Sequence, residues 1–301
     1  MRYLLYLLLL SVILLNTCQQ SSQSQNLPKE PKPERSLQKI TSVPIPEYLT
    51  FAGERVPLDK KDVRERLERE LLVNSYRHAS TVQLIKKAYR WQPFIQEVLR
   101  KKGIPTDFFY LAVAESDLSN FARSPAGAMG MWQFMRRTAG EYGLEVSRNV
   151  DMRRDPAAAA KAACVYFKNA YNKFGNWTLT AAAYNRGSSG IATALSKQKS
   201  NNYYDLYLNP ETSRYVFRIL AFKVILSNPQ QYGFFIPNQD KYQPWEFREV
   251  EVTKSLASLP AFAKEQGISY RLLKVYNPWI DSPDYAFAIA PGKTYTFRIP
   301  N

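Results

Sequence analysis

The chain has 301 residues, of which 45% are hydrophobic and 22% charged, so it has enough apolar material for one large domain or two smaller ones. Its formal net charge of +15 favours an anionic partner, such as membrane headgroups, nucleic acid or an acidic polymer, or else a merely soluble basic surface. No arginine-rich run or nucleic-acid-binding signature occurs, so we expect no nucleic-acid partner.

The first 18 residues predict the cellular compartment in which the protein is found. Arg2 gives a positive start, residues 4–15 are almost wholly apolar, and the stretch ends at Cys18. About a dozen apolar residues are too few to span a bilayer comfortably and are typical of a secretory signal. The segment resembles a bacterial lipoprotein signal, in which Cys18 carries the lipid and becomes the N-terminus. Simple cleavage by the general signal peptidase and an uncleaved anchor are the alternatives.

The lipoprotein resemblance also implies a location. We expect an envelope protein that faces the periplasm and is attached to a membrane through its N-terminal lipid. Gln19 stands where an aspartate retains lipoproteins at the inner membrane of well-studied enterobacteria, which favours the outer membrane.

The next segment, 19–61, is predicted to be a flexible tether. Residues 19–46 are rich in Gln, Ser, Lys and Pro and contain few apolar side chains. Such a composition cannot bury a core.

Residues 62–232 are predicted to form a nearly all-helical domain. Apolar residues recur at three-to-four spacing, first from Val63 to Leu72 and again from Ile85 to Leu99. Asp155 and Pro156 precede an alanine-rich stretch, a pattern typical of a capped helix start. Further helices are expected over 177–184 and 213–227.

The character of the chain changes after a proline-bearing linker predicted at 233–246. Residues 247–252 and 295–299 alternate like strands, and two short helical patterns, 256–265 and 270–275, lie between them. We therefore expect a small strand-helix-helix-strand module over 247–301, and a mainly α protein with one small α+β part.

Glu115 is the candidate for acid–base chemistry, because it ends a helical run whose residues 108–113 are apolar. An apolar surrounding disfavours the carboxylate and raises the pKa, which suits a proton donor near neutral pH. Asp117 is the rival second carboxylate, but residues two apart on a helix point to different sides, so we expect a solvated or capping role. A salt-bridged core glutamate is the alternative interpretation of Glu115.

Other reactive groups are scarce. His78 is the single histidine, and Cys164 is the single cysteine after Cys18. A metal cluster or a Ser-His-Asp triad is therefore excluded. Cys164 lies in the alanine-rich helix pattern and is expected to be a small core residue.

Four short segments occur in a fixed order along residues 80–230. They are Glu115-Ser116, Gly130-Met131-Trp132-Gln133, Ala183-Tyr184-Asn185-Arg186-Gly187 and Glu211-Thr212-Ser213-Arg214-Tyr215-Val216. Together they resemble the lysozyme-like (SLT) lytic transglycosylases, most closely the membrane-bound murein transglycosylase D type.

The resemblance implies a lysozyme-like fold, peptidoglycan glycan strands as the partner and no cofactor. Glu115 would protonate the glycosidic oxygen between N-acetylmuramic acid and N-acetylglucosamine, and would then take a proton from the C6 hydroxyl that attacks C1. Six residues match positions that bind substrate, namely Ser116, Met131, Gln133, Tyr184, Asn185 and Tyr215. Glu211 matches a supporting position. Trp132 and Trp177 are expected to pack on sugar rings.

The C-terminal module resembles a LysM domain, a peptidoglycan-binding fold. Its matching pieces include 255–259, Gly267-Ile268-Ser269 and Asn277-Pro278, while the usual Gly-Asp-Thr turn is replaced by Val252-Thr253-Lys254. Sugar binding and a purely packing role remain open for this module. For the whole chain, goose-type hydrolysis by water and a non-catalytic wall-binding scaffold are the alternatives.

Overall fold

A computed structural model describes residues 40–301, so the predicted signal, its Cys18 and the first part of the predicted tether lie outside the described residues. The chain divides after Thr41, and residues 42–301 form one compact unit. Within the described part, no helix is both long enough and apolar enough to cross a membrane.

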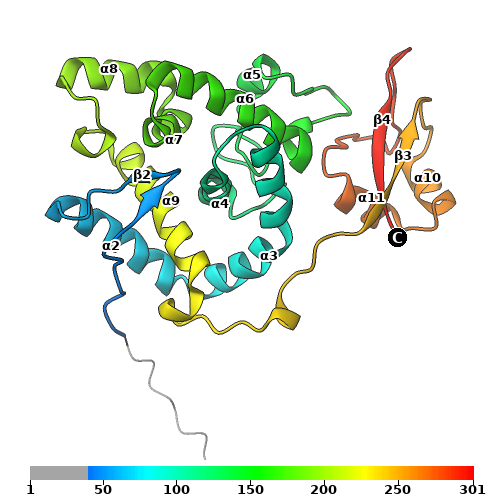
Figure 1. Ribbon diagram of the computed structural model, residues 1–301. Helices are drawn as coiled ribbons and strands as arrows, with labels where there is room; N and C mark the ends of the chain where they lie inside the picture. The colour runs from blue at the N-terminus through cyan, green and yellow to red at the C-terminus, as the bar shows by residue number, and fades with distance from the viewer. Residues whose placement is uncertain (1–39) are drawn as a thin grey trace, which may run out of the picture. The chain divides into compact units, whose positions relative to one another are not determined.

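Eight helices build the larger part of this unit, and short 3-10 turns precede α4, α6 and α9. Helix α4 lies at the centre, between α3 and α9 (Figure 1). The helices are α2 (Lys61–Tyr76), α3 (His78–Lys101), α4 (Phe109–Ser116), α5 (Arg136–Glu141), α6 (Pro156–Phe174), α7 (Trp177–Arg186), α8 (Ser188–Gln198) and α9 (Pro210–Ser227). The all-helical character predicted for this region is confirmed.

The apolar run of α4 accounts for its central position. Residues 109–113 are all buried, so every face of the helix contacts other elements rather than water. The helix ends because Asp117 adopts the left-handed conformation, with φ of 48°. Glu115 therefore lies in the last turn, where the packed centre of the domain meets the surface.

The structure corrects the predicted tether over its described residues. A small hairpin, β1 (Thr50–Phe51) paired with β2 (Glu54–Arg55), lies within it, and Phe51 is 0% exposed. Five apolar side chains from the end of this segment enter the core of the helical domain: Val43, Leu49, Phe51, Val56 and Leu58.

The predicted linker also makes contacts. Phe234 is buried in the helical core, the Tyr242 amide donates to Lys86 O (3.3 Å), and Arg90 Nε donates to Gln243 O (2.8 Å). This segment therefore packs along α3 through hydrogen bonds to Lys86 and Arg90.

The C-terminal module has the predicted order of elements. Strand β3 (Phe247–Val252) pairs antiparallel with β4 (Tyr295–Pro300), in a register that sets Phe247 opposite Pro300. Helices α10 (Leu259–Glu265) and α11 (Tyr270–Tyr276) lie between the strands in sequence, and α11 packs on β4. The module has an aromatic core of its own, which includes Trp279, Phe287 and Phe297. The predicted fold class, a helical domain with a small βααβ module, is confirmed.

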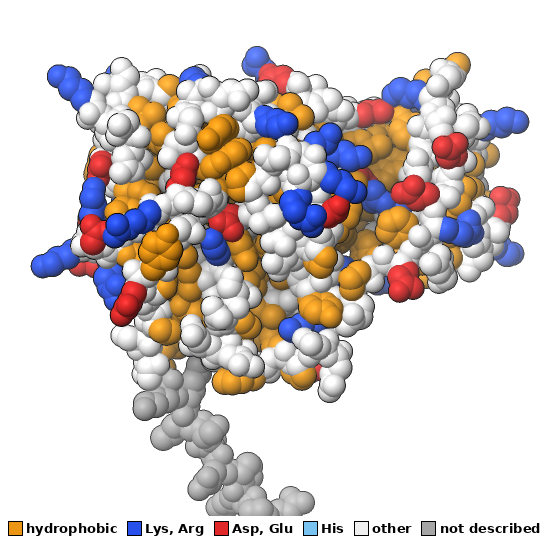
Figure 2. Space-filling view, viewed as in Figure 1, with side chains coloured by type: hydrophobic (Ala, Val, Ile, Leu, Met, Phe, Trp, Pro, Cys, Tyr) orange, Lys and Arg blue, Asp and Glu red, His pale blue; other side chains and the backbone are white. Residues whose placement is uncertain are grey.

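The surface charge is mixed on the visible face. Figure 2 shows Lys and Arg side chains distributed among acidic and apolar ones. The positive net charge therefore does not form one continuous basic surface on this face.

Candidate active site

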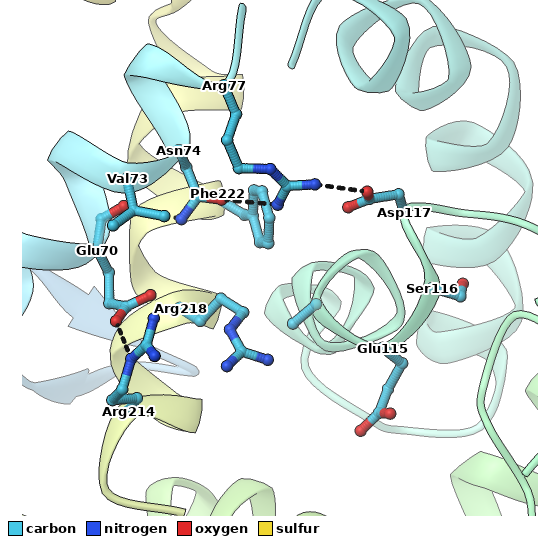
Figure 3. Close-up of a pocket in the computed structure, with 11 residues that line it drawn as sticks. Glu70, Val73, Asn74, Arg77, Glu115, Ser116, Asp117, Arg214, Arg218 and Phe222 are labelled. Atoms are coloured by element: carbon cyan, nitrogen blue, oxygen red, sulfur yellow. Dashed lines mark hydrogen bonds and ion pairs between the residues drawn. The ribbon is translucent and has the colours of Figure 1, made fainter. Parts of the chain in front are cut away.

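Glu115 lines a pocket of about 320 Å³ between α2, the end of α4 and α9 (Figure 3). The pocket combines a few apolar side chains with several charged groups. Its lining residues are Glu70, Val73, Asn74, Arg77, Ala114, Glu115, Ser116, Asp117, Arg214, Arg218 and Phe222. Because α2 and α9 pack on each other, residues far apart in sequence share this site.

The Glu115 carboxyl group has a phenol as its hydrogen-bond partner. The hydroxyl of Tyr215, on the buried face of α9, donates to Glu115 Oε1. Burial raises the pKa of Glu115 to about 7, while the Tyr215 hydrogen bond and the charge of Arg218 act in the opposite direction. Glu115 can therefore both give and accept a proton near neutral pH.

The other carboxylates of the pocket each have an arginine partner. Glu70 accepts from Arg214 Nε at 2.6 Å, and Asp117 accepts from Arg77 at 3.1 Å. Figure 3 shows Glu115 and Asp117 leaving the end of α4 in different directions, as the helix geometry predicts. Of the three carboxyl groups that line the pocket, Glu115 differs in that its hydrogen-bond partner, Tyr215, is neutral.

Glu211 lies at the exposed start of α9. It is 3.3 Å from Arg218, and its charge slightly opposes ionisation of Glu115. Glu211 is thus linked to the pocket through Arg218, which lines it.

Three predicted site residues meet at one loop. The Ser116 hydroxyl donates to Met131 O at 2.9 Å, and Gln133 Nε2 donates to Ala122 O (3.0 Å) and Gly130 O (2.8 Å). The side chain of Met131 is buried in the core. The structure thus uses Ser116 and Gln133 to fix the loop, and no predicted residue except Glu115 and Ser116 lines the pocket itself.

Tyr184 and Asn185, at the end of α7, approach the site from another side. Tyr184 donates to Trp132 O at 2.7 Å, and burial together with the nearby Glu115 charge raises its pKa well above the ordinary value. The Asn185 Oδ1 atom accepts from the Thr212 hydroxyl at 2.8 Å, which joins α7 to the start of α9.

The comparison with known families agrees with this geometry. Residues 92–207 match the "Transglycosylase SLT domain" and residues 248–301 match the "Soluble lytic transglycosylase C-terminal LysM-like domain". The chain carries an SLT transglycosylase domain. The matched residues include Glu115 and the next two motifs, whereas the fourth motif, with Tyr215, lies beyond them.

Individual relatives cover parts of the chain. Membrane-bound lytic murein transglycosylase D of Escherichia coli is 31% identical over 235 residues, which are 75% of this chain and 50% of the relative. The chain thus spans about half the length of that curated relative.

Two solved structures are also similar in part. Soluble lytic transglycosylase Slt70 of Escherichia coli has a TM-score of 0.42 at 17% identity, over 60% of this chain and 33% of its own. Lytic transglycosylase Slt of Pseudomonas aeruginosa has a TM-score of 0.38 at 17% identity, over 61% of this chain and 36% of its own.

The expected sugar-stacking role of tryptophan is wrong for Trp132. Its ring is fully buried in the SLT domain and packs against Phe167. Trp177 is partly buried and stacks on Tyr171 at 3.9 Å between ring centroids. Cys164 is buried, and burial raises its pKa to about 11, which confirms the core role predicted for it.

The sequence patterns do not predict the arginines of the pocket. Arg77 follows the last residue of α2, Arg214 and Arg218 lie on α9, and each pairs with an acidic residue. Arg214 belongs to the fourth motif, and this membership is the signal in the sequence that could have placed it near the site. Arg77 precedes Glu115 by 38 positions and lies outside all four motifs.

Proposed function

We propose that this chain is a peptidoglycan lytic transglycosylase with Glu115 as its one general acid and base. The observation that carries the proposal is the environment of Glu115. Its carboxyl group has a pKa raised to about 7 and accepts a hydrogen bond from the Tyr215 phenol. The other carboxylates of the pocket are paired with arginine. Ordinary glycoside hydrolysis uses two carboxyl groups. A site with one suits a substrate that supplies its own nucleophile.

The reaction proceeds in two proton transfers. Protonated Glu115 gives its proton to the oxygen of the β-1,4 bond between N-acetylmuramic acid and N-acetylglucosamine, and the C1–O bond breaks with its electron pair on the leaving oxygen. The C6 hydroxyl of the muramic acid bonds to C1, and its proton goes to the Glu115 carboxylate. The products are a 1,6-anhydromuramic end and a new N-acetylglucosamine end, and Glu115 regains its proton.

The surrounding residues orient the acid and the substrate. Tyr215 holds one oxygen of Glu115, so the other is free to face the bond that is cleaved. Ser116, Met131, Gln133 and Tyr184 form or fix the loop that faces the acid, and their role in binding is part of the proposal. Asn185 and Glu211 support the start of α9.

The proposal includes a location. Lipid attachment at Cys18 would hold the enzyme at the periplasmic face of the outer membrane, and the name of the E. coli relative describes that protein as membrane-bound. Labelling with a radioactive fatty acid, compared between the wild type and Cys18→Ala, tests the attachment. Label retained by Cys18→Ala would contradict it.

Product analysis tests the chemistry. Purified sacculi are digested with the full chain, and mass spectrometry identifies the muramic ends. Anhydro ends, 18 Da below reducing ends, support transglycosylation. Reducing ends would instead indicate hydrolysis by water, and sacculi that bind the protein but release nothing would indicate a scaffold.

A further inference from the structure

The C-terminal module is joined to the SLT domain through the segment 145–155. The Val150 side chain is 1% exposed and belongs to the apolar core of the module rather than to that of the helical domain. On either side of it the Asp151 amide donates to Trp279 O, and the Asp281 amide donates to Asn149 O, both at 2.8 Å. The segment thus forms a short antiparallel bridge with the module, in which Val150 lies opposite Ile280 and its side chain enters the module's core.

The two ends of the segment also bind polar and charged side chains of the module. Glu145 accepts from Lys293 at 2.9 Å and from the Tyr295 hydroxyl at 3.0 Å, while Asp155 accepts from Arg298 at 2.8 Å. Asp155 also caps α6. These partners come from both ends of the segment, so the module holds it along its full length.

Arg153 links the same segment to the loop at the active site. Its side chain is 7% exposed and donates to both oxygens of Asp151, each at 2.8 Å. It also donates to Gly127 O (3.1 Å) and Phe134 O (3.2 Å), the two ends of the loop 127–134. Because this buried guanidinium binds the carbonyl groups at both ends of the loop, it fixes the span of the loop.

Backbone packing strengthens this link. Gly130 has φ of 81°, and a Cβ atom there would lie 1.9 Å from Arg153 O. The two backbones can approach so closely only because residue 130 is a glycine. The loop therefore rests directly on the segment that the module holds.

The loop also contacts residues beside Glu115. Ser116, the neighbour of Glu115, donates to Met131 O, and Tyr184 donates to Trp132 O. A continuous set of contacts thus runs from the module through Asp151 and Arg153 to the loop beside the acid.

We propose that the LysM-like module is a fixed support of the active site, and that Arg153 is the positioning residue through which it sets the loop 127–134. The module then contributes to the rate of bond cleavage, whatever it adds to wall binding. The kinetic part of this inference rests on the proposed function; the structural part does not.

Hydrogen exchange of the full chain tests the structural part. Val150→Asp introduces a charge into the core of the module and is expected to undock it. Val165→Asp is the matched control, because Val165 is 48% exposed on α6. We expect the amides of 127–134 to exchange at least tenfold faster in Val150→Asp than in the wild type, and at an unchanged rate in Val165→Asp.

Kinetics on soluble glycan strands tests the functional part. We expect kcat to fall about tenfold or more in Val150→Asp with KM within about twofold, because a misplaced loop weakens the transition state more than binding. If Val150→Asp does not fold, Val150→Ala replaces it, with a smaller change in the same direction.

Two results would overturn the inference. Unchanged exchange in 127–134, while the module itself loses protection, would make the module an independent appendage. A rise in KM alone, with kcat kept, would make it a sugar-binding domain only. Neither result bears on the proposed chemistry, which the product analysis of the wild type decides separately.

Discussion

Two carboxyl groups on opposite sides of the loop 127–134 differ in their partners. Asp151 is 3% exposed and receives two hydrogen bonds from the Arg153 guanidinium, so its negative charge is compensated. Glu115 is also held among protein atoms, but its partner is the neutral phenol of Tyr215, and its pKa rises to about 7. Asp151 therefore has a structural role, whereas Glu115 can change its protonation state near neutral pH.

The difference shows that burial alone does not mark a catalytic acid. A buried carboxylate beside a guanidinium organises the backbone around it. A buried carboxyl group with only a neutral partner is the one whose proton can move at neutral pH. Four experiments can break or sharpen this contrast.

The largest expected effect follows Glu115→Gln, which keeps the shape and removes the proton donor. Clearing of purified sacculi should fall about 1,000-fold or more, equivalent to about 4 kcal/mol of transition-state stabilisation, while binding to sacculi is kept. Glu141→Gln is the control, because Glu141 pairs with Arg137 on the exposed surface of α5. Clearing by Glu115→Gln at the wild-type rate would exclude Glu115 as the acid.

Arg153→Met should produce the next effect, on stability. Removing the Arg153 guanidinium leaves the buried Asp151 with only the more distant Arg154 Nε, at 3.9 Å, so the free energy of unfolding should fall by about 3–5 kcal/mol. Chemical denaturation measures it. Arg137→Met, at an exposed i,i+4 pair, should change it by less than about 0.5 kcal/mol. Equal losses in the two variants would contradict the structural role of the Asp151–Arg153 pair.

Tyr215→Phe should lower kcat about tenfold, because Glu115 loses the donor that orients it. The Tyr215 hydroxyl also holds the pKa of Glu115 down, so its removal should move the loss of activity to higher pH than in the wild type, where it is expected above about pH 7. Tyr171→Phe removes a hydroxyl outside the pocket and serves as control. A shift to lower pH would refute the assigned hydrogen bond.

The last effect concerns the dependence of stability on pH. The pKa of Glu115 is raised from 4.5 to about 7 in the folded protein, so folding favours the protonated form. That contribution is complete below about pH 4.5 and is lost as the pH rises through 7. Glu115→Gln should therefore gain about 1–3 kcal/mol over the wild type at pH 8 compared with pH 4, measured by urea denaturation. A difference independent of pH would mean that the pKa is not raised.

The local patterns of the sequence predict the candidate acid and the elements that carry it. The apolar run 109–113, the alternating strands of the module and the order of the four motifs all depend on neighbouring residues, so they are readable without a structure. The failures also have local causes. The predicted helices 177–184 and 213–227 leave out α8, in which Gly190 lowers the helix propensity. The order of the motifs also carries no information on how deeply the Trp132 ring is buried.

By itself, the sequence determined Glu115 as the candidate acid, because a lone glutamate at the end of an apolar helix, followed by three further motifs in a fixed order, matches a general acid. Only the tertiary structure decided what that acid touches. Tyr215 is 100 positions from Glu115, and Trp279 is 128 positions from Asp151. Such contacts arise from the packing of α4 on α9 and of the module on 145–155, and no periodicity within one segment encodes them.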